Sequence, residues 1–557
     1  MARRGSSFLQ GSVPSFSDDF ETTTDINDCR VWEWGSCSIE NPDHFEHGTN
    51  IASYIEFVSQ SPRTVYFHNL AFDATFILDY IMKNGWKYVK ENPKDGEFTT
   101  LISNAGKFYT VTLIANGNRI EFRDSFKKIP LSVSQIAKTY KLEEQKLEID
   151  YDAYRPIGYT PTEDEINYLR NDVTIVAKAM RALLMVGMKK LTAGADALSD
   201  YKKMAGRSFK RTFPILSKTV DDEIRKAYRG GFTYINPDRA GKLLGPGRVY
   251  DVNSLYPYVM NSKPIPYGYP DMCEGAPDTD EEFIASITFT ASLKPHGIPC
   301  IQIKRSPHFA PTHYQTEIKE PVTLSVTSVD LRLWQDNYDL DIISWNGSFI
   351  FKTATDLFTD FISKWSEVKE RSEGGERFLA KRQMNSLYGK FATNTNVTGK
   401  YPVLRDGHVA LVTGPHEERD PVYTPAGVFI TAWARDTTIR AIMANRERFI
   451  YGDTDSMHLL DWEEPREVLV HDTRLGAWKL ETEFTKGVFV RAKQYSEVDL
   501  QGVTHTHIAG LPLSVARNVR CEDLLLDREW HGKLVPVRVS GGTILRDTSF
   551  TFKAKDR

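Results

Sequence analysis

The sequence lacks long hydrophobic runs: none of its 557 residues lies in an apolar stretch that approaches the roughly 18 residues of a membrane span. Its mean hydropathy is −0.40. The N-terminal stretch MARRGSSFLQGSVPSF contains Arg3 and Arg4 but no apolar segment after them, so it does not fit a secretory signal. We expect residues 1–14 to form a short flexible leader, and the chain to act in the cytoplasm without a membrane.

Cysteine is scarce, and the few cysteines are scattered. They are odd in number and form no Cys-x-x-Cys pair, which argues against a disulfide framework and against a zinc ribbon. A reducing cytoplasm is the expected environment. The five are Cys29, Cys37, Cys273, Cys300 and Cys521.

Neither sign of charge dominates the chain. Its 70 Lys and Arg residues against 74 Asp and Glu residues give a net charge of −4, which counts mildly against a protein coated in basic charge. One basic patch stands out, and it fits either a nucleic-acid contact or a solvated helix face. Its members are Lys202, Lys203, Arg207, Lys210 and Arg211.

The length predicts three or four domains, and the strand and helix patterns predict a mixed α/β and α+β class. The first 185 or so residues alternate strand and helix patterns, and a capping box of Thr162 and Glu165 opens the longest predicted helix. Strands are predicted at 16–21 and 63–67, helices at 71–84, 163–188 and 432–446, a loop-rich stretch at 190–250, an inserted subdomain of short β-runs with turns near Pro307 and Pro311 at 300–356, two helices split at Ser372–Gly375, a turn-rich insertion at 396–425, and a strand-rich tail at 480–557.

Three acidic side chains in the second half require a counter-charge. Asp453 and Asp455 lie two apart in the hairpin-like stretch IYGDTDSMHL, and Asp251 ends a strand-like run. Like charges that close raise each other's pKa and destabilise the fold unless a cation lies between them. If Asp251 lies beside the hairpin, the three carboxylates suit two magnesium ions and in-line phosphoryl transfer.

An isolated acidic pair can also be structural, because most such pairs lie in turns or on solvated faces. An EF-hand is excluded, since Met457 and His458 occupy positions where its loop needs a ligand and a glycine. The chain also lacks a P-loop.

The stretch ERFLAKRQMNSLYGKFAT predicts a helix with one cationic face. Arg377, Lys381, Asn385 and Tyr388 recur at helical spacing, and Lys369 lies in the preceding helix. Cations followed by an aromatic suit a nucleoside triphosphate, although a solvated helix face is the common alternative.

The N-terminal half contains a second group of acids. Asp19 and Glu21 are two apart on a predicted strand, Asp73 follows a strand end, and Tyr168 and Asp172 are spaced by one helical turn. Four acids from three elements again suit two metal ions, with the tyrosine orienting an attacking water.

Three motifs in this order, DVNSLYP, KRQMNSLYGKF and YGDTDS, resemble those of family B DNA polymerases, in the form of the protein-primed subgroup of small phages with linear genomes. The resemblance runs from about residue 15 to the end. It implies a ribonuclease-H-like 3′–5′ exonuclease domain and a right-hand polymerase domain with two inserted subdomains. The implied boundaries are a leader at 1–14, exonuclease 15–189, palm 190–301 and 426–512, a terminal-protein insertion 302–356, fingers 357–393, a second insertion 394–425 that closes a ring with the thumb, and thumb 513–557.

The resemblance assigns the polymerase site. Asp251 and Asp455 would bind two Mg²⁺ ions, for which Mn²⁺ can substitute, with Asp453 beside them and the Val252 carbonyl as a further ligand. Lys381, Lys369 and Arg377 would bind phosphates, and Tyr256, Asn385 and Tyr388 would line the nucleotide site, with Tyr256 excluding a 2′-hydroxyl. DNA contacts are implied for Tyr228, Gly230, Gly231, Lys390, Lys493 and Tyr495, the last two in the Lys-x-Tyr element at the primer end.

For the exonuclease, the resemblance implies metal binding by Asp19, Glu21, Asp73 and Asp172, with Glu148 where relatives can have an aspartate. Lys146 and Tyr168 would assist the chemistry. Implied ligands of single-stranded DNA are Thr22, His68, Asn69, Phe72, Phe76, Ser125 and Phe126. Ordinary helix core is an equally good interpretation for one of Phe72 and Phe76.

The expected function is protein-primed, processive, strand-displacing DNA synthesis with proofreading in the host cytoplasm. Expected partners are DNA, dNTPs, a terminal protein and phage DNA-binding proteins, with the chain a monomer. The alternatives are a family B enzyme that uses nucleic-acid primers and a binding module with dead acidic sites. A reverse transcriptase would lack the exonuclease stretches.

Overall fold

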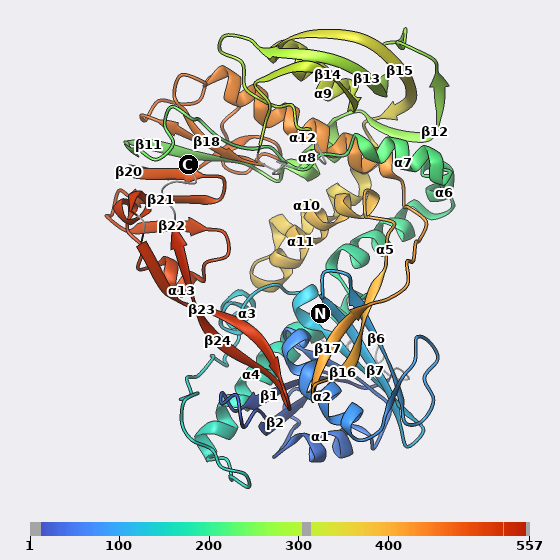
Figure 1. The fold of residues 1–557 in the computed structure, drawn as a ribbon, viewed down its shortest axis with the longest axis vertical. Helices are drawn as coiled ribbons and strands as arrows, with labels where there is room; N and C mark the ends of the chain where they lie inside the picture. The colour runs from blue at the N-terminus through green and yellow to red at the C-terminus, as the bar shows by residue number, and fades with distance from the viewer. Residues whose placement is uncertain (1–12, 304–312, 527, 553–557) are drawn as a thin grey trace.

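The computed structural model describes residues 13–303, 313–526 and 528–552. Pro307, Pro311 and most of the predicted leader therefore lie outside the described residues. Figure 1 shows the N-terminal elements in blue at one end of the molecule and the β13–β15 sheet at the other, with helices α10 and α11 between them. Among the described residues, no helix is long and apolar enough to cross a membrane.

The N-terminal domain is built on a mixed sheet in which β1 and β4 run parallel at the centre. The predicted strands and helices are confirmed to within a few residues, and Thr162 and Glu165 form the predicted capping box. The strands are β1 (Ser15–Thr22), β2 (Val31–Ser38), β3 (Phe45–Gly48), β4 (Arg63–Phe67), β5 (Lys87–Tyr88), β6 (Glu97–Ser103), β7 (Phe108–Ala115) and β8 (Asn118–Asp124); the helices are α1 (Ile51–Val58), α2 (Leu70–Lys83), α3 (Val133–Tyr140) and α4 (Glu163–Met185).

A second sheet, with strand order β22-β21-β20-β11-β19-β18-β9, carries the three acids of the second half. Its strands come from segments more than 200 residues apart, since β11 pairs with both β19 and β20. The bounds are β9 (Thr233–Ile235), β10 (Leu243–Leu244), β11 (Gly247–Val252), β18 (Phe449–Asp453), β19 (Ser456–Leu460), β20 (Trp478–Arg491), β21 (Gln494–Asp499) and β22 (Thr504–Ile508), with α8 (Leu255–Ser262) following β11.

Several segments differ from the sequence prediction. The supposedly loop-rich stretch 190–250 begins with three helices, α5 (Ala193–Ala205), α6 (Phe209–Thr212) and α7 (Lys218–Lys226); they are short, and side-chain caps from Thr192 and Ser217 open α5 and α7. Helix α12 (Thr424–Ala444) begins eight residues before the predicted start. It is buried on nearly all sides, so its sequence has no amphipathic period to mark the first two turns.

A four-stranded sheet of order β12-β15-β13-β14 forms the region expected to be inserted. The sheet begins at Ile265, because β12 (Ile265–Cys273) and β13 (Glu282–Leu293) both pair with β15 of the expected insertion. The resemblance instead implies that residues 190–301 belong to the palm. Long strands β14 (Glu317–Thr327) and β15 (Tyr338–Ala354) flank helix α9 (Ser328–Asn337) where short β-runs were expected.

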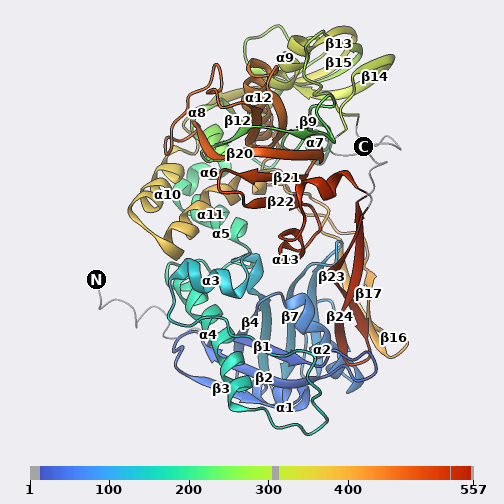
Figure 2. The same ribbon diagram turned by 90° about the vertical axis from the view of Figure 1, so that its left-hand side faces the viewer.

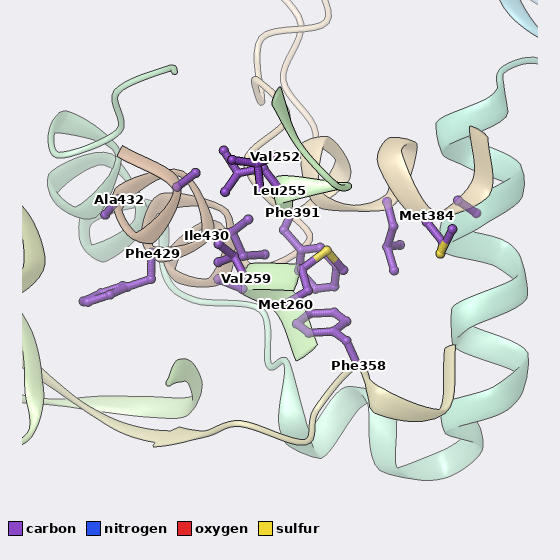
Figure 3. Close-up of a cluster of buried hydrophobic side chains, with 14 of the residues drawn as sticks. Val252, Leu255, Val259, Met260, Phe358, Met384, Phe391, Phe429, Ile430 and Ala432 are labelled. Carbon is purple, nitrogen blue, oxygen red and sulfur yellow. The ribbon is translucent and has the colours of Figure 1, made fainter. Parts of the chain in front are cut away.

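The two helices around the glycine break are α10 (Thr359–Arg371) and α11 (Gly374–Phe391), as predicted. Figure 3 shows how α11 is fixed: its Met384 and Phe391 lie in one hydrophobic cluster with Val252 and Val259 of the β11–α8 segment. All four side chains are essentially inaccessible to solvent. This core sets the distance between the cationic helix and the acidic strand.

The C-terminal segment is mainly β, as predicted, and its last hairpin reaches back to the N-terminal domain. Figure 2 shows β23 and β24 beside β16 and β17. Ile544 joins the core that contains Phe76, and Lys83 Nζ donates a hydrogen bond to Ser540 Oγ at 2.8 Å. The remaining elements are β16 (Gly399–Arg405), β17 (His408–Thr413), α13 (Leu513–Ala516), a 3₁₀ turn at Cys521–Leu525, β23 (Arg528–Val539) and β24 (Gly542–Phe552); β16 pairs with β6, and β17 contacts β23.

The hairpin tip should depend on a glycine. Gly541 has φ +97°, and a Cβ there would lie 1.9 Å from the Cys29 carbonyl oxygen. Gly541→Ala should displace the tip and raise the rate of proteolysis within 528–552 several-fold. Gly502 is the matched control, because it has φ +80° but a Cβ at that position would meet no atom within 4 Å, so Gly502→Ala adds only left-handed strain of about 1 kcal/mol. Equal proteolysis of both variants would contradict a docked tip.

Candidate active sites

The acids of the second sheet meet at one end of three neighbouring strands. Asp251 lies opposite Ser456 in the β11–β19 ladder, and Asp453 pairs with the same serine across the hairpin. The Val252 N–H donates to the Asp455 carbonyl at 2.8 Å. The predicted convergence of Asp251 with the hairpin acids is therefore present in the fold.

Asp251 and Asp455 form no ion pair with any residue that the structure describes. Burial, and then the charge of Asp455, raise the pKa of Asp251 to about 7, although Lys381 opposes the shift. Burial likewise raises the pKa of Asp455, with Asp453 adding to the shift. Two carboxylates that are costly to ionise together favour a divalent cation between them.

Asp453 has a protein cation of its own. Burial would raise its pKa, but hydrogen bonds from Lys493 and Thr233 and the charge of Lys493 lower it below the ordinary value. Lys493 Nζ lies 2.6 Å from Asp453 Oδ2, and Thr233 Oγ1 donates to Asp453 Oδ1 at 2.9 Å. Part of the counter-charge that the hairpin requires thus comes from a lysine 40 residues further along the chain.

The cationic residues predicted to bind nucleotide gather beside this end of the sheet. Arg377 donates to the Lys369 carbonyl at 2.6 Å, and Lys369 Nζ lies 3.4 Å from Ser254 Oγ. Burial, and then the charges of Arg377 and Lys381, lower the pKa of Lys369. Three cations that repel one another in this way suit a polyanion such as a triphosphate.

The two predicted tyrosines of the nucleotide site pack against each other. The rings of Tyr256 and Tyr388 are stacked, with centroids 3.8 Å apart and planes 14° apart. Asn385 is half-buried on the same helix as Tyr388. The stacked pair thus joins α8, which follows the acidic strand β11, to the cationic helix α11.

One glycine of AYRGGFTYIN packs directly against the turn between Asp453 and Asp455. A Cβ on Gly231 would lie 2.5 Å from Thr454 Oγ1, between the two hairpin acids. The Gly230 carbonyl accepts a hydrogen bond from Arg435 at 2.8 Å. Tyr228 packs partly buried against the same core, and the Lys390 stem lies across Gly194 on α5, where burial and Arg419 lower the pKa of Lys390.

The N-terminal acids form a second, more deeply buried cluster. Asp19 and Glu21 lie on β1, Asp73 in the first turn of α2, and Asp172 on α4. Burial, and then repulsion by Asp172, raise the pKa of Asp19 to about 7, and the pKa values of Glu21, Asp73 and Asp172 are also raised, mainly by burial. Oδ1 of Asp73 and Oδ1 of Asp172 are buried without a hydrogen-bond partner among the described residues. Orphaned carboxylate oxygens fit cation ligands.

Both clusters have the donor chemistry that Mg²⁺ prefers, because their acids supply carboxylate oxygens. Within the described ranges, no three acidic, histidine or cysteine side chains already enclose a cation position. Each cluster instead brings acids close enough to perturb one another. The Val252 carbonyl remains a predicted ligand.

Lys146 contacts the cluster of N-terminal acids, as predicted. It forms an ion pair with Asp172, and its Nζ donates to the Tyr168 hydroxyl at 2.8 Å. The Tyr151 hydroxyl lies 2.5 Å from the Tyr168 hydroxyl, a contact that sequence reasoning missed although Tyr151 ends the QKLEIDY stretch. Glu148 is exposed, and in the described structure it has no hydrogen bond or ion pair to the cluster.

The predicted ligands of single-stranded DNA divide by exposure. Asn69 and Phe126 are exposed, while Thr22, His68 and Phe72 are half-buried. Ser125 is fully buried and bonds His68 Nδ1 at 2.9 Å. Phe76 is 1 % exposed in the core beneath the C-terminal hairpin, which is the alternative interpretation given above for one of the two phenylalanines.

Sequence reasoning also missed Asp124, whose Oδ1 accepts the N–H groups of Asn69 (3.2 Å) and Phe126 (2.9 Å) and so holds two of the predicted DNA-binding segments together. Its only signal was its position at a strand end, next to Ser125 and Phe126.

Comparison with known proteins decides the family. Residues 55–161 and 148–469 match the family "DNA polymerase type B, organellar and viral". The DNA polymerase of Bacillus phage Nf is 41% identical over 568 residues, covering 97% of this chain and 99% of that polymerase, and that of Bacillus phage phi29 is 40% identical over the same coverage. The chain belongs to the type B DNA polymerases. It is a DNA-directed DNA polymerase of the kind found in these phages.

The solved phi29 DNA polymerase complexed with primer-template DNA and incoming nucleotide superposes with a TM-score of 0.92 at 38% identity, covering 97% of this chain and 100% of that one. The architecture is thus that of a multidomain type B polymerase with an exonuclease domain and a polymerase domain. One acidic cluster lies around β1 of the N-terminal sheet, and the other lies at β11 and the β18–β19 hairpin of the second sheet.

Cation binding should change the pH dependence of stability. Asp19 and Asp251 have pKa values of about 7 in the folded protein, against an ordinary value of 3.8. Between pH 3.8 and pH 7, the folded protein without cations therefore binds more protons than the unfolded chain. Its free energy of unfolding should therefore fall as pH rises from about 4 to about 7. Added Mg²⁺ should raise the melting temperature more at about pH 8 than at about pH 6. At a Mg²⁺ concentration of a hundred times the Kd, the stabilisation of the folded protein is about 2.7 kcal/mol.

Differential scanning fluorimetry with MgCl2, against NaCl of equal ionic strength, measures this increment. Asp19→Asn combined with Asp251→Asn should shrink it. An increment that is equal at both pH values would contradict competition between protons and the cation.

Proposed function

We propose that this polymerase replicates a linear phage genome by protein-primed initiation and strand-displacing synthesis, with 3′–5′ proofreading, in the host cytoplasm. The observation that carries the proposal is the presence of two separate clusters of mutually perturbed carboxylates on two sheets of one type B polymerase chain. One cluster adjoins a cationic nucleotide-binding helix, as synthesis requires. The other adjoins a tyrosine and a lysine, which suit the orientation of an attacking water in hydrolysis.

For synthesis, bound divalent cations would activate the primer hydroxyl and stabilise the charge on the leaving phosphates. Asp251 and Asp455, with the Val252 carbonyl, are the proposed ligands, and Asp453 holds Lys493 at the primer end. Lys369, Arg377 and Lys381 bind the triphosphate by charge-assisted hydrogen bonds. Tyr256 packs beneath the sugar and excludes a 2′-hydroxyl, while Tyr388 and Asn385 line the base.

For proofreading, Asp19, Glu21, Asp73 and Asp172 are the proposed ligands of a second pair of cations. Tyr168 orients the attacking water, and the Lys146 ammonium, which contacts both Tyr168 and Asp172, fixes that hydroxyl. Asn69, Phe72 and Phe126 offer accessible surface for an unpaired 3′ end, which stacking would hold without sequence preference.

For initiation and processivity, we assign the sheet between Ile265 and Ala354 to the terminal-protein region and the β16–β17 hairpin to ring closure. Three contacts support a closed ring: β16 pairs with β6, β17 contacts β23, and the β23–β24 tip packs on the N-terminal domain. A ring would hold the duplex without a separate clamp. The enzyme would act as a monomer with DNA, dNTPs, a terminal protein and phage DNA-binding proteins.

The two chemistries should separate by mutation. Asp455→Asn should lower primer extension by at least about 10³-fold, since it removes a proposed metal ligand, and leave degradation of single-stranded DNA nearly intact. Asp19→Ala with Glu21→Ala should do the reverse. Gel assays of both reactions on one labelled primer measure this. Loss of both activities in either variant would refute the division into two sites.

Protein priming is tested with the cognate terminal protein and a single labelled dNTP. The enzyme should transfer the nucleotide to a hydroxyl of that protein, and Asp455→Asn should not. If only nucleic-acid primers are extended, the enzyme is a type B polymerase that starts from ordinary primers.

A further inference from the structure

A buried histidine–glutamate pair lies behind the polymerase site. His458 on β19 and Glu497 on β21 have exposed fractions of 2 % and 4 %, and Nδ1 of the histidine lies 2.9 Å from Oε1 of the glutamate. A carboxylate only accepts hydrogen bonds, so Nδ1 carries the proton and donates it. Neither residue was among those expected to act in catalysis or binding.

The pair joins two strands that are not neighbours in the sheet. In the strand order β22-β21-β20-β11-β19-β18-β9, β20 and β11 separate β21 from β19. No ladder hydrogen bonds can therefore tie the strand that follows Lys493 to the hairpin that carries Asp453. Side chains instead connect the two segments, through contacts with one another and with the backbone N–H of Lys493.

These contacts form three successive rungs. The first is Lys493 Nζ on Asp453, supported by the Lys493 N–H, which donates to the Tyr451 hydroxyl at 3.0 Å. The second is Tyr495, whose ring centroid lies 5.2 Å from that of Tyr451 and 5.1 Å from that of His458. The third is the hydrogen bond between Glu497 and His458. Tyr495 and Glu497 are two residues apart on β21, so both side chains lie on the same face of that strand.

We propose that Glu497 and His458 are positioning residues that hold the Lys-x-Tyr element against Asp453 and so set the primer-terminus site. The inference rests on the proposed role of Lys493 at the primer end. Lys493 itself lies in a turn with φ +58°, a conformation that a lysine adopts only under constraint, and its side chain is 57% exposed. An exposed lysine on a strained turn needs a rigid base, and the buried third rung supplies it.

A charge-assisted bond suits this task better than apolar contact. The rings of Phe489 and His507 stack on Tyr495, with ring centroids 5.4 Å and 4.8 Å from its own. Stacked rings can shift parallel to one another, so this contact does not fix the position of Tyr495 along the strand. The His458–Glu497 bond has a fixed direction and length, and both groups are removed from water that could replace it. It therefore fixes the register of β21 along the hairpin, which stacking alone does not.

The decisive comparison is between two changes at this pair. The double variant His458→Phe with Glu497→Leu replaces both buried polar groups by apolar ones, so no unpaired charge remains and the fold should persist. It should raise the KM for primer-template about tenfold with little change in kcat, because positioning of the primer end is lost. Glu497→Gln keeps an oxygen that accepts the His458 proton, and it should stay within about twofold of the parent enzyme.

A second readout does not depend on turnover. A fluorescent base analogue at the primer 3′ end, with Ca²⁺ in place of Mg²⁺ and no dNTP, reports how far the end is stacked in the duplex. The double variant should show the signal of an unstacked end, and Glu497→Gln should not. Degradation of single-stranded DNA should remain unchanged in both.

The matched control is Glu483→Gln. It removes the carboxylate of the Arg248–Glu483 ion pair, a 2.8 Å contact between β11 and β20 in the same sheet, and it should alter neither KM nor fluorescence. Unchanged KM in the double variant, or equal losses of synthesis and degradation, would overturn the positioning role. If the double variant does not fold, Glu497→Gln decides: a tenfold rise in its KM would overturn the role of the hydrogen bond.

Lys493→Ala separates this inference from the proposed function. If it leaves KM unchanged, the assignment of Lys493 to the primer end fails. If it raises KM while the pair variants do not, only the positioning role fails.

Discussion

Carboxylates that are buried beside one another, without enough protein cations to neutralise them, are the constraint on which the rest of the structure depends. Asp251 and Asp455 in one domain, and Asp19, Glu21 and Asp73 in the other, all have pKa values raised by burial and mutual repulsion. Such clusters weaken the fold unless a ligand compensates. Two such clusters in one chain are the reason we propose cation binding at both.

The surrounding fold is organised to hold these clusters in place. Asp251 lies near the end of β11 and Asp73 in the first turn of α2, and the residue after each is packed into core: Val252 is buried with α11, and Ala74 is fully buried. Rigid placement of this kind keeps repelling charges at a fixed separation. The protein cations Lys381, Lys493 and Lys146 then neutralise part of the charge from outside the core.

Much of the site could be predicted from the sequence because its chemistry is local. The spacing of Asp453 and Asp455, the helical repeat of Arg377, Lys381 and Tyr388, and the capping box at Thr162 each lie within about three turns or one hairpin. Interactions over that range depend on backbone geometry that neighbouring residues determine. The helix Thr424–Ala444 shows the limit: its first two turns are buried on every side, so the pattern disappears there and its first residues could not be assigned.

By itself the sequence determined the acidic and basic residues, the elements that carry them and the family to which the three motifs belong. Only the tertiary structure decided that Lys493 meets Asp453, that Glu497 bonds His458 across two intervening strands, that Tyr151 touches Tyr168, and that Phe76 is covered by the last hairpin. These contacts join residues that strand order brings together from distant segments. Strand order is set by the burial of whole sheets and helices rather than by any local pattern of residues.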